Sequence, residues 1–287
     1  MPLSLPRRPQ RWTALFLFAL LALVASSSIA SAASPPPTMA IDQQNTVVIS
    51  PPNPTAVVVF LHGLGDSAHG WASQLAAIAE ELPHVKFILP TAAPRPVTVA
   101  MGRKMPAWYD IEAFVGGAGY AEGIDLTRDL ILNLIAKEVR TGCPTATVMG
   151  CELTDALGYC CARQVEAGIP YSRIVLGGFS QGGAVSYFTG YQTKQPLGGV
   201  MVLSSFIPRE KEFTYAPETA KVPLLICHGD ADSRARYEWA QQSRQRLAAA
   251  GVEDIEFHTY PGMDHTSSPR ELQDITAWLQ RVLSASN

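Results

Sequence analysis

Gly178-Phe179-Ser180-Gln181-Gly182 is the stretch of this sequence that decides its fold. The mostly apolar residues 173–177 before it are typical of a buried strand, and residues 183–188 after it can continue as a helix. A strand–serine–helix turn this tight holds the serine in strained backbone geometry, for which the flanking glycines leave room. Ser180 is therefore predicted to be a nucleophile beside a helix N-terminus. A glycine-rich turn that merely contains serine would look the same, so the prediction depends on the rest of the chain.

A serine hydroxyl needs a base, and the base needs an acid that orients it. Where Gly-x-Ser-x-Gly joins a strand to a helix, the chain order of the three groups is serine, acid, histidine. Residues 255–260 alternate like a strand, and the apolar spacing of residues 271–283 predicts a C-terminal helix. His265 lies on the loop between these two elements, and it is predicted to be the base.

The acid is expected after the apolar strand 222–227, in His228-Gly229-Asp230-Ala231-Asp232. Acids at the carboxyl end of a parallel strand face the crevice in which α/β proteins bind ligands. Asp230 follows a glycine turn and can brace that loop, whereas Asp232 can reach the loop of His265. We therefore predict Asp232 as the orienting acid.

An early strand, residues 56–61, runs into His62-Gly63-Leu64-Gly65-Asp66. Stabilising a tetrahedral oxyanion requires two preorganised N–H donors. One is expected from Gln181, the residue after the nucleophile, and Leu64 is the best-placed second donor. A plain glycine-rich turn is the alternative interpretation. A phosphate-binding loop is disfavoured because the segment contains neither Gly-Lys-[Ser/Thr] nor Gly-x-Gly-x-x-Gly.

Several segments together resemble the acyl-protein thioesterase and lysophospholipase group, the phospholipase–carboxylesterase branch of the α/β-hydrolases. The matching segments are Leu61–Asp66, Pro90–Ile111, Gly177–Ala184, His228–Asp232 and Gly262–Ser267. The resemblance implies an α/β-hydrolase fold, with a mostly parallel central sheet and helices on both faces. It also implies hydrolysis of carboxylic esters and thioesters of acyl chains, with Ser180, Asp232 and His265 as a triad. This chemistry needs neither cofactor nor metal.

The resemblance further implies that the Val97–Met105 loop borders an acyl-binding groove. Candidate groove residues are Met101, Met105, Trp108 and Phe206, for each of which core packing is the alternative interpretation. The sequence departs from the family after Asp232, where Ser233-Arg234-Ala235-Arg236 replaces a short Val-Pro element.

A second departure is an insertion at about residues 140–164. A helix is expected to begin at Ile124 and to end near Gly168, and the insertion interrupts it. The insertion contains Cys143, Cys151, Cys160 and Cys161. It is interpreted as a disulfide-stapled loop, as a metal site, or as a segment foreign to the mature protein, such as a retained intron. The absence of histidine and of paired Cys-x-x-Cys disfavours a metal.

The composition is that of an ordinary globular protein, because 47% of the 287 residues are hydrophobic and the net charge is −3. The sequence has no basic stripe of the kind that would indicate a nucleic-acid partner. We expect a targeting leader over residues 1–33, a proline-rich leader over 34–45, and a single α/β-hydrolase domain over 46–287.

The first residues resemble a secretory signal peptide. Arg7, Arg8 and Arg11 precede the apolar run 12–25, which is too short for a typical membrane span, and Ala30-Ser31-Ala32 offers a cleavage site. We therefore expect a secreted or lumenal protein with no stable membrane span after the leader is removed. An organellar transit peptide and an uncleaved signal anchor are the alternatives.

A lumenal enzyme would not meet proteins acylated at the cytosolic membrane face. This favours a broader carboxylesterase or lysophospholipase role, acting on a lipid, an acylated protein or a small ester. The alternative from another functional class is a slow-turnover small-molecule receptor on the same fold, which the fold alone does not exclude.

Overall fold

The computed structural model describes residues 37–41, 45–113, 121–140 and 168–284. All of them belong to one compact unit, Pro35–Asn287. The expected leader 1–33 lies outside the described residues. So does the expected insertion 140–164, apart from the backbone of Arg140, together with its four cysteines.

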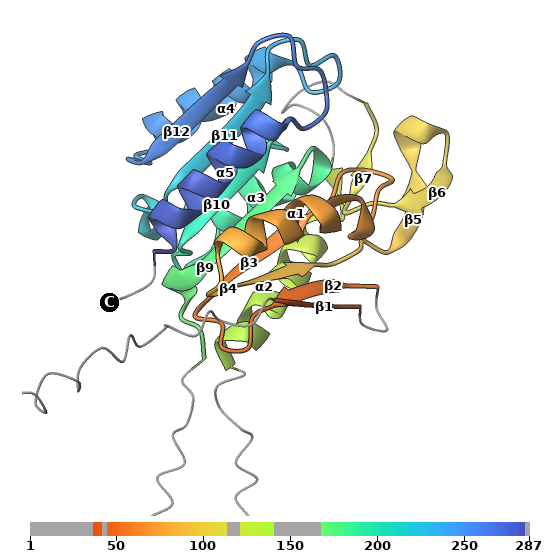
Figure 1. Ribbon diagram of the computed structural model, residues 1–287. Coiled ribbons are helices and arrows are strands. Elements are labelled where there is room, and N and C mark those ends of the chain that lie inside the picture. The colour runs from red at the N-terminus through yellow and green to blue at the C-terminus, as the bar shows by residue number, and fades with distance from the viewer. Residues whose placement is uncertain (1–36, 42–44, 114–120, 141–167, 285–287) are drawn as a thin grey trace, which may run out of the picture. The chain divides into compact units, whose positions relative to one another are not determined.

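The described residues form an eight-stranded sheet in the order β1-β2-β4-β3-β9-β10-β11-β12 (Figure 1). Every pairing from β4 through β12 is parallel, and β1–β2 and β2–β4 are antiparallel. The strands are β1 (Thr38–Ile41), β2 (Val47–Ser50), β3 (Ala56–Leu61), β4 (Val85–Leu89), β9 (Ile174–Phe179), β10 (Gly199–Leu203), β11 (Leu224–Gly229) and β12 (Ile255–Tyr260). The predicted mostly parallel α/β-hydrolase sheet is thus confirmed. Its edge strand β1 lies before residue 46, where the sequence places the start of the domain.

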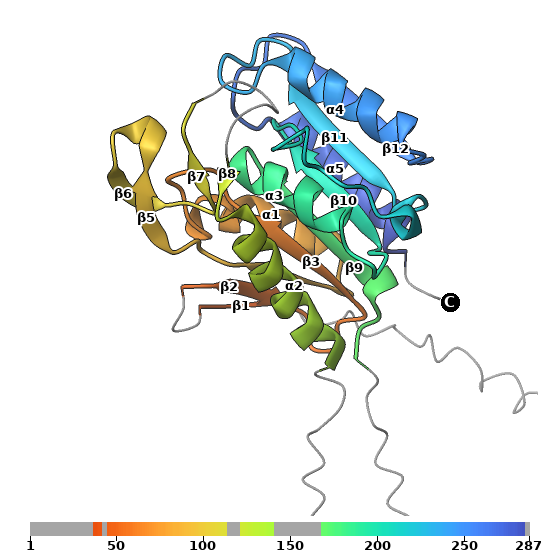
Figure 2. The same ribbon diagram turned by 180° about the vertical axis from the view of Figure 1, so that it is seen from behind.

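Two short hairpins, β5–β6 and β7–β8, stand apart from this sheet (Figure 2). Their strands are β5 (Pro94–Val97), β6 (Arg103–Pro106), β7 (Asp110–Ile111) and β8 (Ala121–Glu122). Single 3₁₀ turns occur at Thr98–Ala100, Tyr171–Arg173 and Pro217–Thr219.

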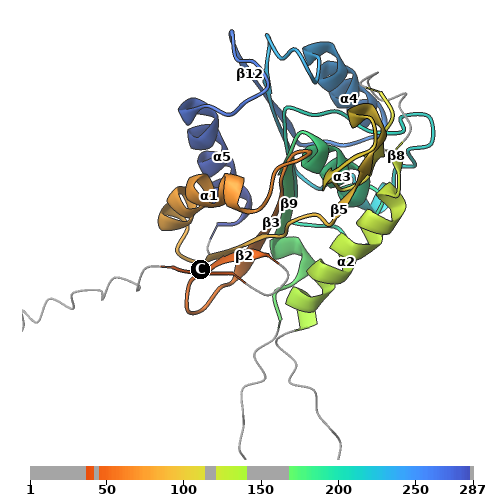
Figure 3. The same cartoon turned by 90° about the vertical axis from the view of Figure 1, so that its right-hand side faces the viewer.

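Helices cover both faces of the sheet, as predicted. They are α1 (His69–Glu81), α2 (Ile124–Arg140), α3 (Gln181–Gly190), α4 (Tyr237–Ala249) and α5 (Pro269–Val282). Figure 3 shows α1 and α5 on one face and α2, α3 and α4 on the other. Each group buries an apolar stripe, represented by Trp71 and Trp278 on the first face and by Ile135 and Phe188 on the second.

The register of the sheet brings the carboxyl ends of its parallel strands to one edge. Leu61 pairs with Gly178, Leu203 with Phe179, and Gly229 with Tyr260. The loops after β3, β9, β10, β11 and β12 therefore converge, which is where ligands bind in open α/β sheets.

Candidate active site

Ser180 occupies the turn between β9 and α3 in a strained conformation. Its φ of 54° and ψ of −118° lie outside the regions favoured by L-residues. The turn is possible because a glycine stands on each side of it. A Cβ on Gly178 would lie 2.5 Å from the carbonyl carbon of Gly182, and one on Gly182 would lie 2.1 Å from the carbonyl oxygen of Leu61. The tight strand–serine–helix geometry predicted from the sequence is present.

The structure brings the three predicted triad residues into one hydrogen-bonded series. Nε2 of His265 lies 2.8 Å from Oγ of Ser180, and Nδ1 of His265 lies 2.8 Å from Oδ2 of Asp232. The side chain of Asp232 is fully buried and that of His265 is 11% exposed, whereas Ser180 is half-buried. The serine therefore faces the site, with the acid enclosed behind it.

Asp232 is held in its charged form. Burial by itself raises the pKa of this carboxyl, but the hydrogen bond and charge of His265 oppose burial. The backbone N–H groups of Ala235 and Arg234 act in the same direction, and the pKa is lowered overall. An ionised carboxylate can only accept, so His265 carries its proton on Nδ1. Nε2 is then free to accept the hydroxyl proton of Ser180.

Asp230 has the bracing position expected of it. Its Oδ1 accepts a hydrogen bond from the N–H of Gly262 at 2.6 Å. A parallel link joins the same two loops, because Oδ1 of Asp264 accepts from both N–H and Oγ of Ser233. These bonds fix the loop of Asp232 relative to the loop of His265.

The other described histidines have structural partners. Nε2 of His62 accepts from the N–H of Ala92, so Nδ1 of His62 carries the proton and donates to the carbonyl of Gly63. Burial lowers the pKa of His62 and that of His228. Nε2 of His228 donates to the carbonyl of Ala235. His84 and His258 bond to Leu283 and Glu256, respectively.

The two predicted oxyanion donors, Leu64 and Gln181, line the same cavity as Ser180. Gln181 is the first residue of α3, so its N–H has no acceptor four residues earlier within the helix. Leu64 lies in the loop after β3, and the N–H of its neighbour Gly65 bonds to the carbonyl of Pro106, which anchors that loop.

The side chain of Gln181 has a role that sequence reasoning did not find. Its Oε1 accepts from the N–H of Trp108, and its Nε2 donates to the carbonyl of Tyr109. Nε1 of Trp108 in turn donates to the carbonyl of His62. The Ser180 turn, the β6–β7 segment and the loop after β3 are thus locked together. The only sequence signal was a polar residue at a helix start, where exposure is usual.

Ser205 was also missed. Its Oγ donates to the carbonyl of Ser180 at 2.7 Å, while the N–H of Ser180 bonds to the carbonyl of Leu203. Both backbone polar groups of the strained residue are therefore satisfied by β10 and the loop that follows it.

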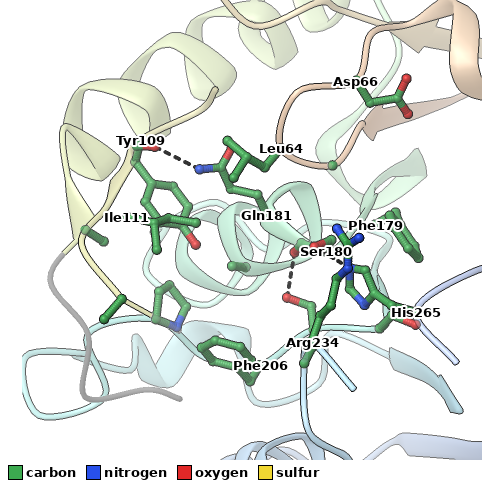
Figure 4. Close-up of a pocket in the computed structure, with 18 residues that line it drawn as sticks. Leu64, Asp66, Tyr109, Ile111, Phe179, Ser180, Gln181, Phe206, Arg234 and His265 are labelled. Atoms are coloured by element: carbon green, nitrogen blue, oxygen red, sulfur yellow. Dashed lines mark hydrogen bonds between the residues drawn. The ribbon is translucent and has the colours of Figure 1, made fainter. Parts of the chain in front are cut away.

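A cavity of about 300 Å³ opens beside Ser180 (Figure 4). Much of its wall is apolar, with side chains that include Leu64, Tyr109, Ile111, Phe179, Phe206 and Pro208. A largely apolar cavity with a few polar groups is typical of a small-molecule binding site.

Of the four predicted groove residues, only Phe206 lines this cavity. Met101 sits at the tip of the β5–β6 hairpin with φ of 56° and is 98% exposed, because the hairpin turn carries its side chain outward. Met105 lies in β6, outside the lining. Trp108 is buried in the core, where it supports the site through hydrogen bonds. For these three residues the expectation of a groove-lining role is corrected.

Fold and site together define an α/β-hydrolase. Residues 43–283 match the family model described as Phospholipase/Carboxylesterase, and the chain belongs to this family of ester hydrolases. It is 39% identical over 242 residues to acyl-protein thioesterase 1 of Mycosarcoma maydis, covering 81% of this chain and 93% of that protein. Its identity to acyl-protein thioesterase 1 of Gibberella zeae is 36% over 245 residues, with the same two coverages.

A solved structure supports the same assignment. Acyl-protein thioesterase 2 of Zea mays superimposes with a TM-score of 0.65 at 27% identity, covering 83% of this chain and 99% of that one. The resemblance drawn from the sequence motifs is confirmed. Within the described part of the chain, no helix is both long and apolar enough to cross a bilayer.

Proposed function

We propose that this protein hydrolyses carboxylic esters or thioesters of acyl chains by double displacement at Ser180. The observation that carries the proposal is the hydrogen-bonded series from Ser180 through His265 to Asp232, set at an apolar cavity. Relatives named acyl-protein thioesterase 1 support an acyl substrate and include thioesters among the bonds cleaved.

In the first half-reaction, Nε2 of His265 takes the hydroxyl proton while Oγ of Ser180 attacks the acyl carbonyl carbon. The imidazolium that forms is stabilised and kept in orientation by Asp232, which remains ionised. When the carbonyl re-forms, the bond to the leaving oxygen or sulfur breaks. His265 then gives its proton to the departing alcohol or thiol.

The negative charge on the carbonyl oxygen is stabilised by the N–H groups of Leu64 and Gln181. Both are fixed before substrate arrives, so no reorganisation is needed as the charge develops. The Gln181 side chain contributes indirectly, since its bonds to Trp108 and Tyr109 hold the surrounding loops in place.

In the second half-reaction, His265 removes a proton from water, and the resulting hydroxide attacks the acyl-enzyme. The bond between Oγ of Ser180 and the acyl carbon breaks, Oγ recovers the proton from His265, and the carboxylic acid leaves. These residues account for each proton transfer, so the proposed cycle uses no cofactor.

The place of action is proposed from the sequence alone. Residues 1–33 have the charged start, short apolar run and small-residue site of a secretory leader, so we propose a secreted or lumenal protein. This location favours a general carboxylesterase or lysophospholipase role over removal of acyl groups from cytosolic proteins. Amino-terminal sequencing of the exported chain checks it. A first residue at Met1, or retention in the cytosol, contradicts it.

The enzymatic proposal is tested by turnover of a para-nitrophenyl hexanoate ester and of a matched hexanoyl thioester. The wild type should release product continuously, and Ser180→Ala should lose several orders of magnitude in kcat. Tight binding of esters with negligible turnover by the wild type would instead support the receptor alternative.

A further inference from the structure

The cavity beside Ser180 carries one permanent positive charge. Among the described residues that line it, Arg234 is the only arginine, and no lysine is present. Arg234 lies on the loop after β11, and Figure 4 shows its side chain extending from that loop toward Ser180 and His265. The side chain is exposed. It is therefore available to a ligand that enters the cavity.

The position of Arg234 is fixed relative to the reacting groups. Its backbone N–H bonds to Oδ1 of Asp232 at 2.9 Å, while Oδ2 of the same carboxylate holds His265. The neighbouring N–H of Ala235 bonds to the same Oδ1, and Ser233 is tied to Asp264. These hydrogen bonds hold the backbone from which the Arg234 side chain extends.

The guanidinium has no protein counter-ion among the described residues. No ion pair or side-chain hydrogen bond between described residues includes the Arg234 guanidinium. By contrast, the guanidinium of Arg236 lies over the ring of Trp239, 5.7 Å from its centroid. Asp66 is the only acidic residue of the described lining, and Figure 4 shows its carboxylate directed away from Ser180. An arginine at a binding cavity without a protein partner favours an anion, which it binds with two parallel N–H bonds.

The chemistry of the site indicates which end of the substrate Arg234 meets. His265 has to protonate the leaving group, so the leaving group lies on the His265 side of Ser180. Figure 4 shows Arg234 on that side, with Tyr109 and Ile111 across the cavity. The apolar side suits the acyl chain, and the charged side suits the alcohol or thiol portion.

Resting on the proposed hydrolase function, we infer that Arg234 is a specificity-determining residue for esters whose leaving group carries an anion. The anion is a carboxylate or a phosphate, placed beyond the scissile bond. Acyl esters of this class are favoured over neutral esters of the same acyl chain.

Matched substrates test the inference. The carboxylate arm compares hexanoate esters of para-hydroxybenzoate and para-hydroxybenzamide. The phosphate arm compares hexanoyl glycerol phosphate with hexanoyl glycerol. A third arm moves the anion to the acyl side, by replacing hexanoate with the adipate monoester of para-hydroxybenzamide. The measured quantity is the ratio of kcat/KM for the charged over the neutral substrate. Intrinsic leaving-group reactivity cancels when this ratio is compared between variants.

Arg234→Leu should lower this ratio about tenfold in at least one leaving-group arm, the fold-change expected for losing one charge-assisted hydrogen bond. Arg234→Lys should keep part of the preference for the charged substrate, because lysine retains the positive charge but not the planar guanidinium that binds an anion with two parallel N–H bonds. The matched control is Arg236→Leu, which removes a charge two residues away, outside the cavity lining, and should leave the ratio unchanged. Salt should weaken the wild-type preference.

Equal ratios for wild type and Arg234→Leu in both leaving-group arms would overturn the inference, as would a loss confined to the adipate arm. The hydrolase function would still stand if the neutral esters were cleaved in a Ser180-dependent way. Absence of Ser180-dependent cleavage of every substrate would overturn both.

Discussion

Gly182 lies so close to Leu61 that a Cβ added to it would stand 2.1 Å from the Leu61 carbonyl oxygen. Leu61 ends β3 and leads into the loop of Leu64, whereas Gly182 belongs to the first turn of α3. The missing side chain therefore sets the spacing between the nucleophile turn and the loop that carries Leu64.

Gly182→Ala should disrupt this spacing. The clash is with backbone, which cannot swing away, so we expect a loss of about 1–3 kcal/mol in the free energy of unfolding and a large fall in kcat. Thermal denaturation and ester turnover measure the two effects. Gly63→Ala is the milder comparison, since its Cβ would meet a Phe179 ring atom at 3.2 Å. Wild-type stability and activity in Gly182→Ala would contradict the packing argument.

The two acids after β11 should differ in their effect on catalysis. Asp232→Asn removes the acceptor that keeps the proton of His265 on Nδ1, so kcat should fall by roughly three to four orders of magnitude. Asp230→Asn should retain most of the activity, because Asp230 bonds to Gly262 rather than to His265. Steady-state kinetics of both variants, with circular dichroism as the folding control, decides the matter. Equal losses in two folded variants would refute the assignment.

Glu271 predicts how stability depends on pH. Its carboxyl lies buried in the first turn of α5, and burial raises its pKa from 4.5 to about 7, although the backbone N–H of Ser268 acts in the opposite direction. The folded state thus holds this proton more tightly than the unfolded state does. Its stabilising contribution is complete below pH 4.5, is lost as the pH rises toward 7, and amounts to about 3 kcal/mol.

Glu271→Gln should remove the loss of folding stability that the Glu271 carboxyl causes as the pH rises. Chemical denaturation between pH 4 and 8 should show the wild type losing stability relative to the variant as pH rises. Parallel stability curves for the two proteins would exclude Glu271 as the titrating group.

The insertion should be dispensable for catalysis. None of the residues proposed to act at the site lies within residues 140–164, and deleting them joins Val139 to Val165, so that the helix can end at Gly168. We expect the deletion variant to fold at least as well and to keep its kcat, by comparison of melting temperature and esterase rate. Aggregation of the variant, together with disulfides found by mass spectrometry in the full chain, would show that the segment is part of the working structure.

Local patterns predicted the elements of this fold well where a strand or helix has a single clear period. The alternating residues 255–260 coincide with β12, and the apolar run 56–61 coincides with β3. The Ser180 turn was foreseen because its two glycines leave room for the close approach of backbone that a strand–serine–helix turn requires. Helix α3 begins at Gln181, directly after the strained serine, and it includes residues 183–188, which were expected to be helical.

Contacts between distant segments could not be read in the same way. Two examples are the hydrogen bond between the Trp108 N–H and the Gln181 side chain and the hydrogen bond from Ser205 to the Ser180 carbonyl. Both depend on loops that meet only after the sheet has formed. Met101 was misplaced because nothing local distinguishes a methionine in a groove from one at the exposed tip of a hairpin. Residue type alone did not determine the direction of its side chain.

Labelling by a fluorophosphonate, followed by peptide mapping, tests the central claim most directly. The probe reacts only with a serine that a neighbouring base activates, so it reports the Ser180–His265 pair without a choice of substrate. We predict a single adduct on Oγ of Ser180, abolished in Ser180→Ala and strongly slowed in His265→Ala. An adduct on another serine, or unchanged labelling of folded Ser180→Ala, would contradict the account.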